Sequence, residues 1–369
     1  MSERVIVNFQ RKPCYDIVLD KGFDSLLEEL ELLQYLNQKF VIITDSNVDA
    51  IYGNDMLSLL ESKGISVYKY TFQAGEQSKN LDTVKNIYSF LIEHRIERKD
   101  VLLALGGGVV GDITGYVAAT YLRGIDFIQV PTTLLAQTDS SIGGKTGVDF
   151  DGYKNMVGCF KMPRLVFINL EALNTLDERQ YFAGFAEVMK HGLISDLTFY
   201  EWLIENMYEI CEKDPDVLME MLLRSCNIKK VIVEKDPTEK SVRALLNLGH
   251  TIGHAIEKAK NFELLHGECV ALGIVAAAFI SWKRNLLKME EYYEIRDMFV
   301  PFYLPISVDN IEPEQILAYT KSDKKMENAH IKMVLLKKIG KAVIETDVTD
   351  QEILDAINEI YFSEEDAYA

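Results

Sequence analysis

Half of the six histidines of this chain lie in one short stretch, residues 246–270. His250 and His254 are four residues apart, and His266 follows the segment KNFELL. On a helix, residues four apart share a face, so the first two imidazoles would project together. A second helix that begins near His266 would supply a third. Imidazole nitrogens are common ligands of zinc and similar divalent ions, so the stretch predicts a metal site.

A carboxylate on another helix is the expected further ligand. The segment FAGFAEVMKHG supplies Glu187, with Lys190 one turn later on the same face. His191 also lies four residues from Glu187, and spacing alone does not exclude it as a ligand. The histidines do not form the H-E-x-x-H pattern, so the sequence does not indicate a metallopeptidase.

A glycine-rich loop predicts a second ligand, a dinucleotide. Gly106, Gly107, Gly108 and Gly111 lie between an expected strand and an expected helix, where backbone N–H groups can approach a pyrophosphate. The loop satisfies G-x-G-x-x-G, although a tight turn alone would also do so, and at least two βα units precede it. Polar residues at two neighbouring strand ends support the dinucleotide: Thr132 and Thr133 in PTTLL, and Asp45 in FVIITD. Asp45 is placed either to accept from a ribose hydroxyl or only to cap the next helix.

Composition limits the possible partners. The net charge of −18 over 369 residues argues against binding to nucleic acid, and it makes any cluster of Lys and Arg informative. The segment MSERVIVNFQ lacks the apolar core of a secretory signal, and the longest apolar run, residues 269–282, is too short to span a bilayer. Five scattered cysteines are typical of reduced thiols. We expect a cytoplasmic protein that does not insert in membranes.

The order of elements predicts two domains. Apolar strands alternate with amphipathic helices up to about residue 169, which indicates a parallel sheet covered on both faces. Long helical periods follow, with one late hairpin that turns at Ile339 and Gly340. The predicted fold class is therefore a Rossmann-like α/β domain, residues 1–174, and a mainly α-helical domain, residues 175–369. A cleft between them is the expected ligand site.

Several motifs together resemble one enzyme family. These are GGGVVGDITGYVAATYLRG, VPTTLLAQTDSSIGGKTGVD, GYKNMVG, GFAEVMKHG, RALLNLGHTIGHAIE and LHGECVALG. In order and spacing they are similar to 3-dehydroquinate synthase, of the sugar-phosphate cyclase superfamily, over residues 40–325. The resemblance implies a phosphate-eliminating lyase that uses NAD and one Zn²⁺ or Co²⁺ per subunit. Its substrate would be a phosphorylated sugar acid, 3-deoxy-D-arabino-heptulosonate 7-phosphate, and its product 3-dehydroquinate, in the shikimate pathway of aromatic amino acid biosynthesis.

The resemblance also implies roles for the residues of the histidine stretch. Glu187, His250 and His266 would bind the metal, and His254 would transfer a proton near the C5 oxygen of the substrate. A structural role for His254, orienting a neighbouring side chain, is the alternative.

Family positions around the substrate are also occupied. The residues concerned are Lys145, Lys154, Asn155, Lys190, Lys229, Arg243 and Asn247, with Asp139 near both nicotinamide and substrate. Lys190 and Lys154 would lie near the departing phosphate, and Arg243 and Lys229 near the substrate carboxylate. Lys324 or Lys325 would add one more cation. Arg123 matches an arginine that reaches the phosphate of the neighbouring subunit, which implies a homodimer. Family contacts to NAD fall on Asp45, Glu76, Lys79, Gly108, Asp112, Thr132, Thr133, Lys145, Lys154 and Thr175.

Three other functions compete with this one. A sister cyclase would act on sedoheptulose 7-phosphate or glucose 6-phosphate, which lack a carboxylate and would leave Arg243 and Asn247 with less to bind. A metal-dependent polyol dehydrogenase would have no use for lysines directed at a phosphate. A catalytically inactive NAD-binding regulator is disfavoured because every matched metal and proton-transfer position holds a competent residue.

Overall fold

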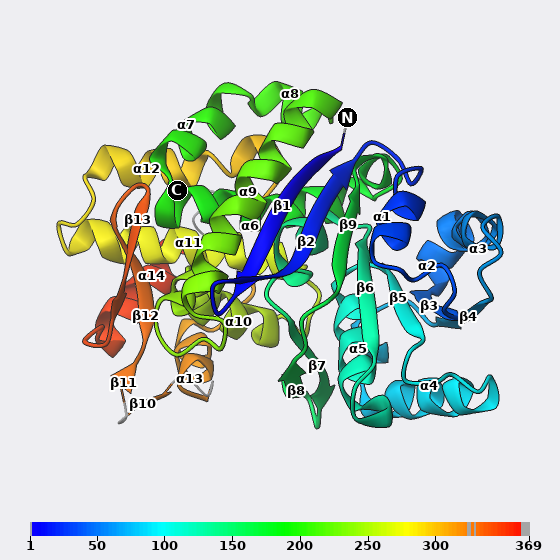
Figure 1. Ribbon diagram of the computed structural model, residues 1–369. Coiled ribbons are helices and arrows are strands. Elements are labelled where there is room, and N and C mark those ends of the chain that lie inside the picture. Colours follow the sequence, from blue (N-terminus) through cyan, green and yellow to red (C-terminus); the bar gives the residue numbers. More distant parts are fainter. Residues whose placement is uncertain (1, 323–325, 328–329, 363–369) are drawn as a thin grey trace. The chain divides into compact units, whose positions relative to one another are not determined.

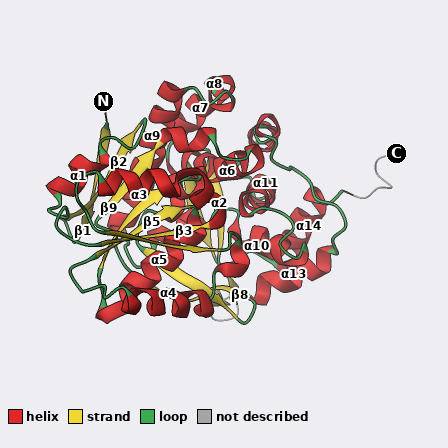
Figure 2. Cartoon of the chain, turned by 90° about the vertical axis from the view of Figure 1, so that its right-hand side faces the viewer, coloured by secondary structure: helices red, strands yellow, loops and turns green. Residues whose placement is uncertain are grey.

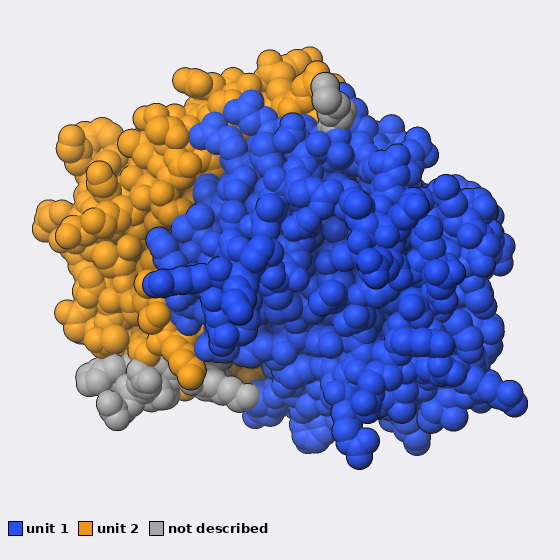
Figure 3. Space-filling model, viewed as in Figure 1, with its two compact units in different colours: residues 1–176, 218–238 blue, residues 177–217, 239–369 orange. Residues whose placement is uncertain are grey.

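The computed structural model describes residues 2–322, 326–327 and 330–362. The chain forms two compact units, which Figure 3 shows in different colours. Unit 1 comprises residues 1–176 and 218–238, and unit 2 comprises residues 177–217 and 239–369.

Unit 1 is built on a seven-stranded sheet with the order β1-β2-β9-β6-β5-β3-β4 (Figure 1). All neighbouring strands are parallel except β1 and β2, which pair antiparallel. The strands are β1 Glu3–Phe9, β2 Lys12–Asp20, β3 Phe40–Asp45, β4 Val67–Phe72, β5 Val101–Gly106, β6 Asp126–Pro131 and β9 Leu165–Asn169. The predicted parallel sheet is therefore confirmed.

Helices cover both faces of this sheet, and Figure 2 shows strands between helices. Along β3, Val41 and Ile43 pack with α4 (Leu81–Glu93) and α5 (Gly108–Thr120). The alternate residues Phe40 and Ile42 pack with α1 (Leu26–Leu32) and α3 (Asn54–Glu61). Because successive strand side chains point to opposite faces, a strand buried on both sides must be apolar throughout. This is why these strands appear in the sequence as continuous apolar runs.

The strand order places the polar residues at strand ends along one edge. The chain leaves β3 for β4 in one direction, then returns past β3 to β5 and continues to β6 in the other direction. The carboxyl ends of β3 and β5 therefore lie at a topological switch point, the usual ligand position in such sheets. Asp45 ends β3, Gly106 ends β5, and the Thr132 N–H donates to the Gly106 carbonyl at 3.0 Å.

Two features of unit 1 were not predicted from the sequence. An antiparallel hairpin, β7 (Lys145–Phe150) and β8 (Tyr153–Phe160), follows the π-helical turn η4 (Ala136–Ser140). Most of helix α9 (Pro215–Lys235) also belongs to unit 1, although it lies late in the chain. It is held there by a hydrogen bond from Cys226 Sγ to the Gln137 carbonyl, 3.5 Å, and by Glu234 Oε1, which accepts from both nitrogens of Asn8.

Unit 2 is mainly helical, as predicted. Its longer helices are α6 Glu178–Ser195, α7 Leu197–Glu205, α10 His250–Ala259, α11 His266–Lys283, α12 Met289–Asp297, α13 Pro313–Ser322 and α14 Asp350–Ile360. The 3-10 helix η6 (Val242–Asn247) precedes α10. Helix α11 is buried from Gly267 to Ser281, which explains its apolar sequence. No helix in the described part of the chain is long and apolar enough to cross a membrane.

The late hairpin also forms, from β12 (Met333–Lys338) and β13 (Lys341–Glu345), with its turn at Ile339 and Gly340. Gly340 has a φ of +79°, and a Cβ atom there would lie 2.5 Å from Leu197 N. A glycine is therefore required at this turn for both conformation and space. The fold class, an α/β Rossmann-like part and a mainly α-helical part, is confirmed.

Shortening a buried side chain of β5 should destabilise unit 1. Leu103 lies in β5 with no exposed surface, so we expect Leu103→Ala to lower the free energy of unfolding by about 2–5 kcal/mol. Leu32, which is 71% exposed, is the control, and Leu32→Ala should change that free energy by less than about 0.5 kcal/mol. Urea unfolding followed by circular dichroism measures both. Equal losses in the two variants would contradict the assignment of β5 to the core.

Candidate active site

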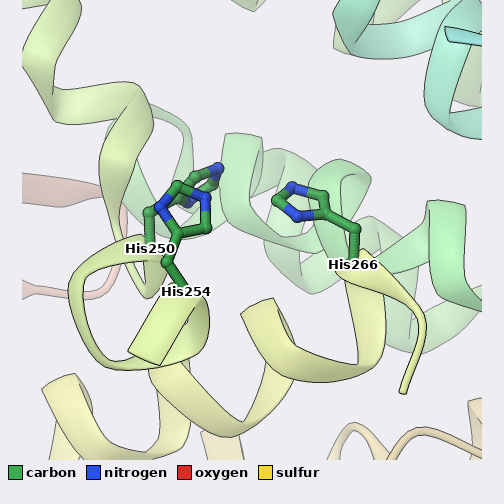
Figure 4. A group of neighbouring side chains, drawn as sticks. All are labelled: His250, His254 and His266. Atoms are coloured by element: carbon green, nitrogen blue, oxygen red, sulfur yellow. The ribbon is translucent and has the colours of Figure 1, made fainter. Parts of the chain in front are cut away.

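Close packing of helices brings the three histidines of unit 2 together. A Cβ atom on Gly273 of α11 would lie 1.8 Å from the Gly249 carbonyl oxygen, just before α10. A Cβ atom on Gly253 of α10 would lie 2.7 Å from the Cys269 carbonyl oxygen. These glycines let the two backbones touch, which side chains would prevent. The imidazoles on α10 and at the first residue of α11 therefore face one another (Figure 4).

Glu187 on α6 completes the arrangement. Its Oε1 atom lies 3.6 Å from His250 Nε2 and 3.5 Å from His266 Nε2. These separations exceed a hydrogen bond of about 2.7–3.2 Å. They are close to the spacing of about 3.3–3.5 Å between ligand atoms that surround a tetrahedral ion at about 2.0–2.1 Å. The Glu187 oxygen thus lies near ligand spacing from one nitrogen of each of two histidines.

The other nitrogen of each ring faces an oxygen atom. His250 Nδ1 lies 3.1 Å from the Leu248 carbonyl oxygen and donates to it, which leaves the Nε2 lone pair facing Glu187. His266 Nδ1 faces Glu257 Oε2 at 3.9 Å, and Glu257 is buried. Metal-binding histidines typically direct the second nitrogen at a carbonyl or a carboxylate in this way. The pattern favours Nε2 of both rings as ligand atoms.

The surroundings shift the pKa values of the two rings in opposite directions. Burial, and then the nearby Lys190 ammonium, hold the pKa of His250 well below its usual value. Burial also disfavours the charged form of His266. The nearby carboxylates of Glu187 and Glu257 outweigh burial and raise the His266 pKa to about 9. In the metal-free protein the carboxylates thus favour a proton on His266, where a cation can take its place.

His254 lies beside this group. One nitrogen from each of His250, His254 and His266 falls within 4.8 Å of the others, so geometry also permits a set of three histidines. The His254 ring centroid is 5.2 Å from that of His250 and 5.7 Å from that of His266. His191 is fully buried on α6 and is not a member of this group among the described residues.

Lys190 and η6 border the same site. The Lys190 ammonium, which is 1% exposed, contacts the Glu187 carboxylate and donates to the Leu246 carbonyl at 2.6 Å. Arg243 is buried in η6. Asn247 ends η6, and its Nδ2 donates to Glu239 Oε1 at 2.9 Å. Lys190 thus contacts a residue of the histidine stretch, and Arg243 and Asn247 lie in the 3-10 helix that leads into α10.

A second cluster forms in unit 1 around Lys79, which is 5% exposed. Its ammonium lies 2.7 Å from Asp112 and donates to Asn155 Oδ1 at 2.6 Å, while Glu76 lies within 3.9 Å. Burial disfavours the charge on Lys79, but Asp112 and Glu76 outweigh it and raise its pKa. Lys154 joins through Glu76, 3.7 Å away. Five residues that were predicted to contact NAD or the substrate thus form one cluster in unit 1.

The glycine loop has the predicted form. Gly107 is the N-cap of α5 and makes no side-chain hydrogen bond to the N–H groups of the first turn, which begins at Gly108. Thr133 packs on this loop, since a Cβ atom on Gly107 would lie 3.1 Å from its methyl carbon. Nearby, Lys229 of α9 lies 2.6 Å from Asp139 Oδ1 and also donates to the Asp139 carbonyl. The predicted residues Asp139 and Lys229 therefore form one ion pair.

Other predicted residues cap a helix, contact a hydroxyl or are exposed. Asp45 Oδ1 accepts from the N–H groups of Asn47 and Val48, so it caps α2 (Ser46–Val48). Thr175 Oγ1 lies 2.6 Å from the Tyr52 hydroxyl. Arg123 and Lys145 are exposed. Lys324 and Lys325 lie outside the described residues.

Sequence reasoning missed some members of the site. Glu257 and Glu239 were not singled out, although each carboxylate contacts a predicted residue. Glu257 lies seven residues after His250 and three after His254, so helical spacing places it on the same face and could have revealed it. No comparable signal marks Glu239, because its contact with Asn247 depends on how the chain turns between α9 and η6.

Comparisons with known proteins identify the class. The fold and the metal and dinucleotide features are those of the sugar-phosphate cyclases. The family model "3-dehydroquinate synthase N-terminal" matches residues 69–183, and "3-dehydroquinate synthase C-terminal" matches residues 184–326. A 3-dehydroquinate synthase of Acetivibrio thermocellus is 44% identical over 95% of this chain and 97% of its own length. The chain belongs to the 3-dehydroquinate synthase family, which confirms the resemblance.

Solved structures agree at lower identity. The 2-epi-5-epi-valiolone synthase of Streptomyces hygroscopicus, solved with NAD⁺ and Zn²⁺, has a TM-score of 0.88 and 28% identity, over 96% of this chain and 98% of that one. A 2-deoxy-scyllo-inosose synthase, solved with carbaglucose-6-phosphate, NAD⁺ and Co²⁺, has a TM-score of 0.85 and 28% identity, over 97% of this chain and 100% of that one.

The ligand set Glu187, His250 and His266 predicts different metal contents for variants of His250 and His254. We expect His250→Ala to lose bound zinc, because His250 Nε2 lies next to the Glu187 carboxylate and its ring is fixed by the Leu248 carbonyl. His254→Ala should retain zinc. Metal content of purified, dialysed protein, measured by mass spectrometry, checks both. Loss of the metal in both variants would support a set of three histidines, and stoichiometric metal in both would exclude His250.

Proposed function

We propose that this protein is a 3-dehydroquinate synthase, a lyase that converts 3-deoxy-D-arabino-heptulosonate 7-phosphate to 3-dehydroquinate and phosphate. The observation that carries the proposal is the convergence of Glu187 with the Nε2 atoms of His250 and His266. Family membership over both matched regions supports it. Curated 3-dehydroquinate synthases are 39–44% identical to this chain, whereas two solved sister cyclases are 28% identical.

The residues present fit a divalent ion and NAD. Glu187, His250 and His266 would hold Zn²⁺ or Co²⁺, one per subunit, since they supply one carboxylate and two oriented imidazoles. The uncapped first turn of α5 would face the NAD pyrophosphate. When bound, NAD would take and return a hydride at C5 of the substrate, and the ion would polarise the neighbouring oxygens.

We assign proton transfer to His254 and stabilisation of the departing phosphate to Lys190. His254 lies beside the proposed ligands, with its ring centroid 5.2 Å from that of His250, and would exchange a proton with the C5 oxygen. Lys190 is a buried cation next to Glu187 and can stabilise charge that develops on the leaving phosphate. Lys154 would add a second cation for the phosphate.

Arg243 and Asn247 would bind the substrate carboxylate. Arg243 is buried, and a planar guanidinium matches a carboxylate with two parallel hydrogen bonds. Asn247 is oriented by Glu239. Lys229 would contribute a further charge, held in place by Asp139. Lys145 and Asn155 complete the substrate set.

NAD would be held mainly by the loops at the carboxyl edge of the sheet. The proposed contacts are Asp45, Glu76, Lys79, Gly108, Asp112, Thr132, Thr133, Lys145, Lys154 and Thr175. The Lys79 ammonium pairs with Asp112 and also donates to Asn155 of β8, so it connects the proposed NAD contacts with the β7–β8 hairpin. We further propose a cytoplasmic homodimer in which Arg123 reaches the phosphate of the neighbouring subunit.

Phosphate release tests the reaction. Purified protein with NAD and Zn²⁺ or Co²⁺ should release inorganic phosphate from the heptulosonate 7-phosphate, without accumulation of NADH, because the hydride returns within each turnover. Sedoheptulose 7-phosphate and glucose 6-phosphate serve as parallel substrates. A higher kcat/KM for either one would indicate a sister cyclase, and steady formation of NADH would indicate a dehydrogenase.

Replacing Lys190 should separate chemistry from metal binding. We expect Lys190→Met to lower kcat for phosphate release by roughly 10²-fold or more, the scale typical of a lost electrostatic or proton-transfer group. Metal affinity should stay equal or rise, because a cation is removed from beside Glu187. Steady-state kinetics and a chelator titration measure the two effects. A loss of metal that matches the loss of rate would contradict the proposed role.

A further inference from the structure

The first turn of helix α11 contacts helix α6 through three successive pairs of residues, here called levels. On α6 the contacting residues are Arg179, Ala183 and Glu187, which are four apart and so share one face. On α11 they are Glu268, Gly267 and His266, which form its first turn. The two proposed metal ligands Glu187 and His266 thus lie at one end of a continuous contact between the two helices.

At each level the α6 residue and the α11 residue lie close together. Arg179 binds Glu268 with two parallel hydrogen bonds, from Nε to Oε1 at 2.6 Å and from Nη2 to Oε2 at 2.8 Å. At the second level the backbones touch, since a Cβ atom on Gly267 would lie 1.8 Å from the Ala183 carbonyl oxygen. At the third level His266 Nε2 lies 3.5 Å from Glu187 Oε1.

Glu268 also fixes where α11 begins. Its Oε2 accepts from the Leu265 N–H at 2.7 Å, as a glutamate at the third helical position does in a capping box. Leu265 has no side-chain oxygen to return the bond, so the buried Glu268 carboxylate makes this cap alone. Arg179 Nη2 also donates to the Glu263 carbonyl at 3.2 Å and so holds the segment before the helix.

We propose that Arg179 and Glu268 are positioning residues that set the separation between Glu187 and His266. The proposal deepens the proposed function, because it depends on the metal site assigned there. The mechanism is geometric. The Arg179–Glu268 pair fixes α11 against α6. The same Glu268 carboxylate caps α11 and so defines its first residue, His266. A bidentate arginine is suited to this because its planar group fixes direction as well as distance.

A matched pair at the far end of α11 provides the control. Arg284 binds Glu352 in the same bidentate manner, at 2.6 and 2.9 Å, and Glu352 accepts from the Thr349 N–H at the start of α14. Arg284 follows α11 by one residue, about 27 Å along the helix from His266. Replacing Arg284 therefore removes a bidentate arginine–glutamate contact from the start of α14 and leaves the start of α11 unchanged.

The test measures Zn²⁺ affinity of metal-free protein by competition with a chromophoric chelator. We expect Arg179→Met and Glu268→Gln to weaken Zn²⁺ binding by about 10-fold or more, the range typical of residues that support ligands, and Arg284→Met to change it less than about twofold. The absorption spectrum of the Co²⁺-loaded protein should change in the first two variants only. Equal affinity in all four proteins, or an equal loss in Arg284→Met, would overturn the proposal.

A conservative variant keeps the proposal testable if Arg179→Met or Glu268→Gln does not fold. Arg179→Lys keeps the charge but cannot bridge both oxygens of Glu268, so it should weaken Zn²⁺ binding by about threefold or more, and unchanged affinity there would also overturn the proposal. The outcome is separable from the proposed function. If the unsubstituted protein binds Zn²⁺ and the variants weaken it as expected, absent phosphate release would contradict only the proposed reaction.

Discussion

The buried carboxylate of Glu187 is the feature on which the site depends. A carboxylate with no exposed surface is stable only when positive charge lies next to it. In this structure the Lys190 ammonium contacts it, and two imidazole nitrogens face it at 3.5 and 3.6 Å. Lys190 offsets the charge of Glu187, and the Glu187 oxygen together with the imidazole nitrogens offers ligand atoms for a divalent cation.

Small residues make that concentration possible. Imidazole groups from separate helices can surround one point only when the helix backbones approach closely, and side chains at the contacts would hold them apart. Gly249, Gly253 and Gly273 allow this between α10 and α11, and Gly267 allows it between α11 and α6. The glycines of LHGECVALG are thus part of the site although they contribute no ligand atom. In unit 1 the glycine loop before α5 serves a comparable purpose, because it lets the backbone approach a ligand.

Much of the fold could be predicted, for identifiable reasons. Strands such as FVIITD are apolar throughout because both faces of the sheet are covered, and this signal is local. The hairpin β7–β8 escaped prediction because its residues alternate irregularly and many are partly exposed. The placement of most of α9 in unit 1 also could not be anticipated. It depends on single contacts such as Cys226 to Gln137, which are 89 positions apart in the chain.

The sequence by itself determined which residues are competent and which helix faces carry them, because i to i+4 spacing and strand order are properties of the chain. It therefore predicted that Glu187, His250, His254 and His266 act together. Only the tertiary structure decided which atoms meet: Nε2 of two histidines toward one glutamate oxygen, Lys190 on that glutamate, and Lys79 between Asp112 and Asn155. The reason is that ring orientation and ion pairing depend on contacts such as the Leu248 carbonyl and the Arg179–Glu268 pair. Those contacts exist only once separate helices have packed.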